Sequence, residues 1–202
     1  MPEHPSRRWD VLLIGGASGT GKSRASYALA RHFDIHITEV DDLALAVRKM
    51  TTPEQQPILH YWHTRTESIV LTPESILELT ISVGRALLPA LEAVVLDHLA
   101  CRTATVMEGD YLLPELVTLL LESDSALKER VRCVFLYEPD ETQLVRNYAS
   151  REPEHDAQTL RAHVSWLYGQ WLNTECGRLG LPALPARPWN TLLHRILATL
   201  GE

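Results

Sequence analysis

The chain has 202 residues, of which 45% are apolar, and 26 acidic against 19 basic residues give a formal net charge of −7. This length suffices for one sizeable α/β domain with an appended lid but is short for two independent domains, and the apolar content excludes global disorder. Because a polynucleotide partner favours a basic face, the acidic balance argues against nucleic acid.

Five runs of apolar residues predict β-strands. In chain order they cover residues 11–14, 35–40, 103–107, 131–137 and 181–184. The first run is wholly apolar, which is typical of a strand buried on both faces of a parallel sheet. Pro182 and Pro185 flank the last run, and an edge position tolerates them.

Helical spacing of apolar residues appears between and after these strands. The patterns cover residues 21–33, 43–50, 72–99, 114–121, 144–148, 157–171 and 189–200. Thr72 and Pro73 are typical of a helix start, and Pro89 should kink or break that helix. We interpret Asp97 as part of it, and residues 51–71 show no regular pattern. Strands that alternate with helices predict a parallel sheet with helices on both faces, which binds ligands beyond the carboxyl ends of its strands.

The clearest motif directly follows the first predicted strand. Residues 16–23 match G-x-x-x-x-G-K-[ST], the P-loop that binds nucleoside triphosphates. Glycines allow the backbone N–H groups to point at phosphate oxygens, and the helix that follows adds a positive partial charge. Lys22 should reach the β- and γ-phosphates and Ser23 should bind Mg²⁺. The predicted phosphate-binding residues are Gly16, Ser18, Gly19, Thr20, Gly21, Lys22 and Ser23.

Acidic residues stand at the ends of the second and third predicted strands. Asp41 and Asp42 follow the second strand, where a carboxylate can accept a proton from an attacking hydroxyl or hold it in line, or cap the next helix. We favour Asp41 because it is nearer the strand end. Glu108 follows the third strand and is the candidate Mg²⁺ ligand, and Asp110 could bind the metal or face the substrate.

Arginines after the fourth and fifth strands are candidates for contact with the nucleotide. Arg146 and Arg151 could neutralise charge on the transferred group from a closing lid, or could be solvated charges paired with nearby glutamates. Arg161 is a further candidate. Arg187 could stack on the base, with Trp189 beside it as a staple for the last helix.

Taken together, these residues resemble those of the P-loop kinases of the nucleoside-monophosphate, shikimate and gluconate kinase type. The resemblance implies a three-layer P-loop NTPase fold with strand order 2-3-1-4-5 and a helical lid. It also implies ATP and Mg²⁺ as cofactors, and Asp41 or Asp42 meeting the acceptor. The run MEGDYLLP at residues 107–114, together with the P-loop, is similar to that of proteins labelled 2-phosphoglycerate kinase. The arginines that hold a nucleotide acceptor have no counterpart beyond Arg48.

We therefore expect one domain over residues 1–202, with a substrate-binding insertion at about 43–100 and a lid at about 146–165. The expected activity is transfer of the γ-phosphoryl group of ATP to a hydroxyl of a small molecule, such as a phosphorylated acid or a sugar-like acceptor. The alternatives are a phosphotransferase with a larger sugar-bearing acceptor, and a nucleotide-dependent regulatory NTPase or binding module. Residues 1–10 lack an apolar signal core. We expect a cytoplasmic protein without a membrane partner, of unassigned oligomeric state.

Overall fold

A computed structural model describes residues 7–66, 70–156 and 158–202, and within them one parallel sheet. Its strands are β1 (Val11–Gly16), β2 (His36–Glu39), β3 (Thr105–Gly109), β4 (Val131–Tyr137) and β5 (Ala183–Pro185). They pair in the order β2-β3-β1-β4-β5. The predicted fold class and strand order are confirmed, and β5 is an edge strand, as its prolines require.

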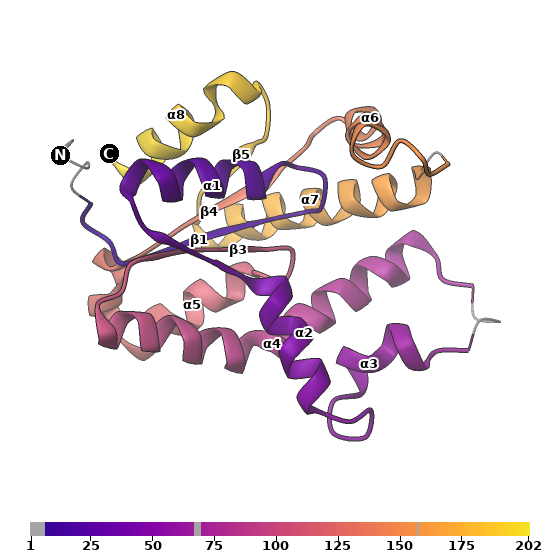
Figure 1. Cartoon of the computed structure of the whole chain (residues 1–202), viewed down its shortest axis with the longest axis horizontal. Coiled ribbons are helices and arrows are strands. Elements are labelled where there is room, and N and C mark those ends of the chain that lie inside the picture. The colour runs from indigo at the N-terminus through magenta and orange to yellow at the C-terminus, as the bar shows by residue number, and fades with distance from the viewer. Residues whose placement is uncertain (1–6, 67–69, 157) are drawn as a thin grey trace.

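Helices cover both faces of this sheet. They are α1 (Lys22–Phe33), α2 (Val40–Met50), α3 (Pro57–Thr64), α4 (Pro73–Cys101), α5 (Pro114–Ser123), α6 (Glu141–Arg151), α7 (Thr159–Leu179) and α8 (Trp189–Leu200), with a 3₁₀ turn at Ser125–Glu129. Alternate residues of β1 separate two cores: Leu12 and Ile14 pack with α1 and α8, whereas Val11 and Leu13 pack with α4, α5 and α7. Figure 1 shows α1 and α8 above the strands and α4 and α5 below them.

Of the predicted kink or break at Pro89, the break is wrong, because α4 continues through the proline. Pro89 lies on the exposed side of the helix, and the buried residues Leu87, Leu91 and Val95 keep the flanking turns on the core. Asp97 is helical, as interpreted. Among the described residues, α4 alone is long and apolar enough to cross a membrane by length and composition. Of its most apolar 18-residue window, 33% is buried inside the protein.

Several boundaries differ from the predicted ones. The irregular region contains α3, which begins at Pro57, because proline is favoured in the first helical turn. Strand β3 runs on to Gly109, so Glu108 lies within the strand and not after it. Residues 1–6 and Ala157, the first position of the predicted lid helix, lie outside the described residues.

The register of the sheet places the functional candidates at one edge. Gly15 of β1 is opposite Gly109 of β3 and Phe135 of β4, so the loops that follow these three strands leave the sheet side by side. Figure 1 shows α6 on one side of this end of the sheet and α2 and α3 on the other. A ligand at the carboxyl ends of the strands is therefore flanked by both groups of helices.

Candidate active site

The P-loop has the backbone conformation that its glycines predict. Gly16, Gly19 and Gly21 have φ values of 155°, 83° and 78°, which L side chains rarely adopt. The Thr20 hydroxyl donates a hydrogen bond of 2.7 Å to the carbonyl of Ala17 and fixes the turn from within. Helix α1 begins directly after Gly21, so its free N–H groups face the loop.

Trp189 covers the end of the P-loop. A Cβ atom added at Gly21 would lie 1.6 Å from the Trp189 ring, so the indole touches the backbone there. Its ring also lines a cavity of about 520 Å³, the P-loop cavity. This cavity is lined by Ser18, Gly19, Gly21, Lys22, Ser23, Arg24, Asn147, Ser150, Arg151 and Trp189. Trp189 is therefore part of the site as well as the first residue of α8.

Lys22 forms an ion pair with Asp110, the residue that directly follows β3. Burial disfavours the charge of Lys22, but attraction to Asp110, Glu108 and Asp41 outweighs burial and raises the pKa of Lys22. The Tyr168 hydroxyl donates a 2.5 Å hydrogen bond to the backbone carbonyl of Asp110 and holds that residue in place. Asp110 supplies the counter-charge that phosphate oxygens would supply in a complex.

Glu108 and Ser23 lie together at the start of α1. Glu108 is 6% exposed, and burial raises its pKa, which Lys22 and a hydrogen bond with Ser23 partly oppose. Within the described residues, no cluster of three or more His, Cys, Asp or Glu side chains could hold a metal by itself. Mg²⁺ in phosphate sites needs only one or two protein oxygens, with phosphate and water completing the shell. The Ser23–Glu108 pair fits that requirement.

A second cavity, of about 320 Å³, lies between α2, α3 and α4, and we call it the helix cavity. Its lining residues are Asp41, Ala44, Leu45, Arg48, Leu59, Trp62, Val83, Asp110 and Tyr111. Asp41 is exposed to solvent as a residue, but neighbouring protein atoms bury part of its carboxylate. This partial burial and then the charge of Asp110 raise the pKa of Asp41, whereas Lys22 opposes the rise. Asp110 thus contacts Lys22 on one side and lines the helix cavity on the other.

The two aspartates after β2 face different surroundings. Both lie in the first turn of α2, since Val40 is already helical. Asp41 lines the helix cavity, whereas the charge of Asp42 acts on Tyr27, a residue of α1. The structure therefore brings Asp41, and not Asp42, to the same cavity as Asp110.

The candidate arginines of α6 are also separated by the structure. Arg151 lines the P-loop cavity, forms a 2.8 Å ion pair with Glu152 and lies over the ring of Tyr148. Arg146 is exposed and is absent from the linings of both cavities. Only Arg151 of this pair is at the site.

Arg187 binds protein groups at the back of the P-loop. It donates to Glu138, which is 2% exposed, at 3.2 Å and to Asn147 Oδ1 at 3.1 Å. Asn147 Nδ2 in turn donates to the carbonyl of Gly19 at 2.9 Å. The chain Arg187–Asn147–Gly19 ties the loop after β5 to the P-loop. The guanidinium carbon of Arg187 also lies over the ring of Trp189, 5.5 Å from its centre. Trp189 lines the P-loop cavity, whereas Arg187 is absent from that lining.

The sequence did not predict the importance of three residues of this site, which are Asp110, Asn147 and Trp189. Asp110 was a secondary candidate behind Glu108, and only the extension of β3 to Gly109 makes it the first residue after the strand. Asn147 lies on α6 three residues after Leu144, and nothing local in the sequence distinguishes it. Trp189 was interpreted as a staple, because its contact with Gly21 depends on how α8 packs on α1.

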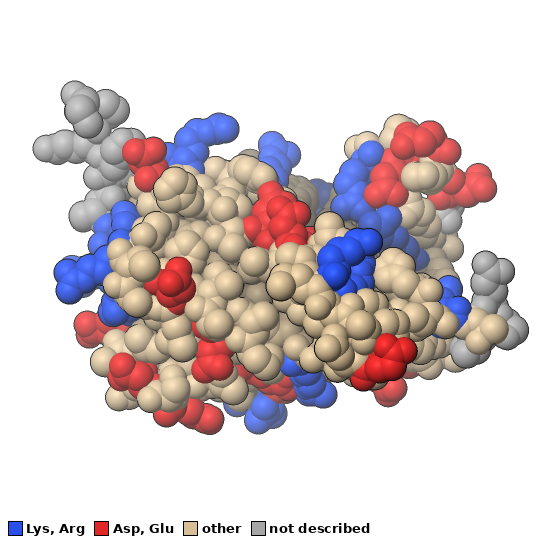
Figure 2. Space-filling view, turned by 60° about the horizontal axis from the view of Figure 1, so that its bottom comes forward, with Lys and Arg blue, Asp and Glu red and all other residues tan. Residues whose placement is uncertain are grey.

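One face of the molecule carries charges of both signs. Figure 2 shows acidic and basic side chains interspersed on one face, together with a hollow beside the projecting part of the molecule. Such a mixed surface does not form a continuous basic stripe on the face shown.

Solved structures share this fold at low sequence identity. A gluconokinase from Sinorhizobium meliloti 1021 matches with a TM-score of 0.56 and 20% identity, over 97% of this chain and 94% of that chain. The chain has a P-loop kinase fold. An uncharacterized protein from Eubacterium ventriosum ATCC 27560 matches with a TM-score of 0.50 and 13% identity, over 96% of this chain and 99% of that chain.

A sugar kinase from Janibacter sp. HTCC2649 matches with a TM-score of 0.48 and 20% identity, over 98% of this chain and 95% of that chain. No protein-family model matches the chain, and no curated protein matches it. At these identities, the likeness establishes the fold and leaves the acceptor to be inferred from the site.

Proposed function

We propose that this protein is an ATP- and Mg²⁺-dependent phosphotransferase that moves the γ-phosphoryl group to a hydroxyl of a small molecule in the cytoplasm. The observation that carries the proposal is the position of Lys22. It lines the P-loop cavity and pairs with Asp110, which lines the helix cavity. Two cavities linked by the ion pair of a P-loop lysine suit two substrates that exchange a phosphoryl group between them.

The P-loop cavity is the proposed site of the nucleotide. Backbone N–H groups at Gly19 and Gly21 and the ammonium of Lys22 would bind phosphate oxygens, and Arg151 would neutralise charge from the lid side. Ser23 and Glu108 would hold Mg²⁺, which supplies charge neutralisation when bound. We replace Arg187 by Trp189 as the residue that contacts the base, because Arg187 is engaged by Glu138.

The helix cavity is the proposed site of the acceptor. Asp41 is the residue assigned to orient the acceptor hydroxyl and to take its proton as the oxygen–phosphorus bond forms, after which the proton passes to solvent. ADP leaves with the electron pair of the broken bond. Asp110 stands between the two cavities and is a second residue that can orient the hydroxyl.

The cation in the helix cavity favours an acceptor that carries a negative group. Arg48 lines this cavity and also borders a small cleft with Lys49, His60 and His63. A carboxylate or phosphate at this end would place the remainder of a small acid between Arg48 and Asp41. This arrangement supports a phosphorylated acid or a sugar acid over a neutral sugar.

The first test compares ADP formation from Mg·ATP with and without a panel of sugar acids, phosphorylated acids and neutral sugars. A phosphotransferase should form ADP slowly alone and much faster with one class of acceptor. ADP formation at one rate under all conditions would contradict the proposal and favour a regulatory NTPase.

A further inference from the structure

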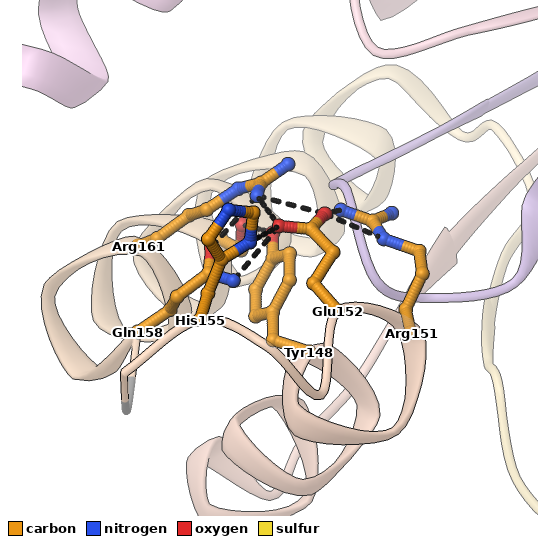
Figure 3. Close-up of polar contacts among 7 residues, drawn as sticks. Tyr148, Arg151, Glu152, His155, Gln158 and Arg161 are labelled. Carbon is orange, nitrogen blue, oxygen red and sulfur yellow. Dashed lines mark hydrogen bonds and ion pairs between the residues drawn. The ribbon is translucent and has the colours of Figure 1, made fainter.

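The turn between α6 and α7 contains a carboxylate that two arginines share. Glu152 accepts hydrogen bonds from Arg151 at 2.8 and 3.0 Å and from Arg161 at 3.1 Å. Gln158 donates to it at 2.8 Å, and His155 Nδ1 lies 3.3 Å away. Figure 3 shows these side chains converging on Glu152 from both sides. The carboxylate therefore binds both guanidinium groups, whose side chains are 47% and 45% exposed.

A buried tyrosine supports the same two arginines. The guanidinium carbons of Arg151 and Arg161 lie 5.0 and 4.5 Å from the centre of the Tyr148 ring. Tyr148 is 1% exposed, and its hydroxyl shares a 2.8 Å hydrogen bond with Ser165. Its ring is also near the P-loop, since a Cβ atom added at Gly19 would lie 3.5 Å from it. The arginines thus rest on a rigid wall beside the loop.

The two arginines face different sides of the P-loop. Arg151 lines the P-loop cavity. Arg161 lines another cavity of about 320 Å³, together with Ser18 and Asp110. A terminal phosphate bound at Ser18 and Lys22 would therefore lie between a guanidinium on the nucleotide side and one on the side of Asp110.

The charges of Glu152, Arg151 and Arg161 leave these two arginines able to bind a further anion. Hydrogen bonds from Gln158 and Arg151, with the charge of Arg161, lower the pKa of Glu152 to about 2, so it is ionised at neutral pH. One negative charge is shared by two positive ones, so the group keeps an excess positive charge. A terminal phosphate, with more charge and more acceptor oxygens, can compete for both arginines.

We propose that Glu152 is a counter-ion which occupies Arg151 and Arg161 until the terminal phosphate of a nucleoside triphosphate displaces it. The inference rests on the proposed function of the P-loop cavity and adds a way to distinguish triphosphate from diphosphate. A β-phosphate would be bound by the P-loop backbone itself, so a diphosphate would offer these arginines much less charge.

The test is the binding of Mg·ATP and Mg·ADP to Glu152→Gln, measured by calorimetry without acceptor. Removal of the competing charge should tighten Mg·ATP binding about fivefold, the lower end of the coupling seen between linked sites, and change Mg·ADP binding by less than about twofold. Glu154→Gln is the matched control, since Glu154 is exposed and two residues away. It should change neither affinity.

A second variant tests the arginine side of the same exchange. Arg161→Met should weaken Mg·ATP binding and leave Mg·ADP binding nearly unchanged, and Glu152→Gln should have a smaller effect in that background. Equal changes for the two nucleotides, no change, or selective weakening of Mg·ATP by Glu152→Gln would overturn the proposal. If Glu152→Gln does not fold, Arg161→Met decides alone, and an equal loss for both nucleotides contradicts the exchange.

These outcomes are independent of the acceptor. Nucleotide binding is measured directly, so a protein that discriminates ATP from ADP as expected but transfers no phosphoryl group would refute the proposed function and not the role of Glu152. If the protein transfers phosphoryl groups but Glu152→Gln leaves its selectivity for ATP over ADP unaltered, the role of Glu152 is refuted and the proposed function is not.

Discussion

Asp110→Asn removes the counter-charge of the P-loop lysine. The side chains of Lys22 and Asp110 are 9% and 29% exposed, so little solvent replaces the lost partner. Loss of one member of a fully buried pair costs about 3–5 kcal/mol, and we expect about 2 kcal/mol here because Asp110 is partly solvated. For a chain of this length, that loss corresponds to a melting temperature about 4–8 °C lower.

Nucleotide should reverse most of this loss, because phosphate oxygens then compensate Lys22. The assay is urea unfolding of the native protein and Asp110→Asn with and without saturating Mg·ATP, and the stabilisation by Mg·ATP should be larger for the variant. The raised pKa of Lys22 means that its ion-pair contribution is complete below the ordinary value of 10.5 and is lost as pH rises through the higher folded value. Measurements at pH 7 therefore contain the whole effect.

The control for this experiment is Asp97→Asn on the exposed side of α4, which should change stability by less than about 0.5 kcal/mol. A difference between the native protein and Asp110→Asn that is the same with and without Mg·ATP would refute the reasoning. It would mean that phosphate does not take the place of Asp110.

Three further perturbations test other parts of the site. Gly21→Ala should lower the free energy of unfolding by about 3 kcal/mol, through backbone strain and contact with Trp189. In a Trp189→Ala background the loss should be about 1–2 kcal/mol, and equal losses in urea unfolding would exclude the contact. Asp41→Asn should lower kcat at least about a hundredfold. Asp42→Asn should change the activation barrier for kcat by less than about 0.5 kcal/mol. Because the pKa of Asp41 is raised, kcat of the native protein should fall with acidification at a pH above its ordinary 3.8; an acid limb retained in Asp41→Asn would contradict this. Arg48→Met should raise the KM of an anionic acceptor about ten- to a hundredfold with little change in kcat, and an unchanged KM would remove Arg48 from the acceptor site.

The strands and the P-loop were predictable because both are local in sequence, whereas the order of the strands came from the resemblance to P-loop kinases. Each strand is an apolar run of the right length, and the glycines of residues 16–23 are required by backbone conformations that the loop itself imposes. Pro89 misled the prediction because a proline removes one hydrogen bond, and a long helix packed on the core tolerates that loss at an exposed position.

The parts of the site that depend on tertiary packing were not predictable. Asp41 and Asp42 are adjacent in sequence, and only the direction of the first turn of α2 separates them. The roles of Arg187 and Trp189 depend on Glu138 and Gly21, which lie far away in the chain. Spacing in the sequence cannot tell which of two neighbouring residues faces the site. The contacts with the buried carboxylate of Glu138 and with Gly21 do so for Arg187 and Trp189.

The central claim is that the γ-phosphoryl group of ATP reaches a small-molecule hydroxyl in this cleft. The most direct measurement incubates the protein with Mg²⁺, γ-labelled ATP and the acceptor class that accelerates ADP formation, with Lys22→Ala as the control. We expect label in a phosphorylated product that is absent with Lys22→Ala. Label released only as free phosphate, or a product that persists with Lys22→Ala, would contradict it.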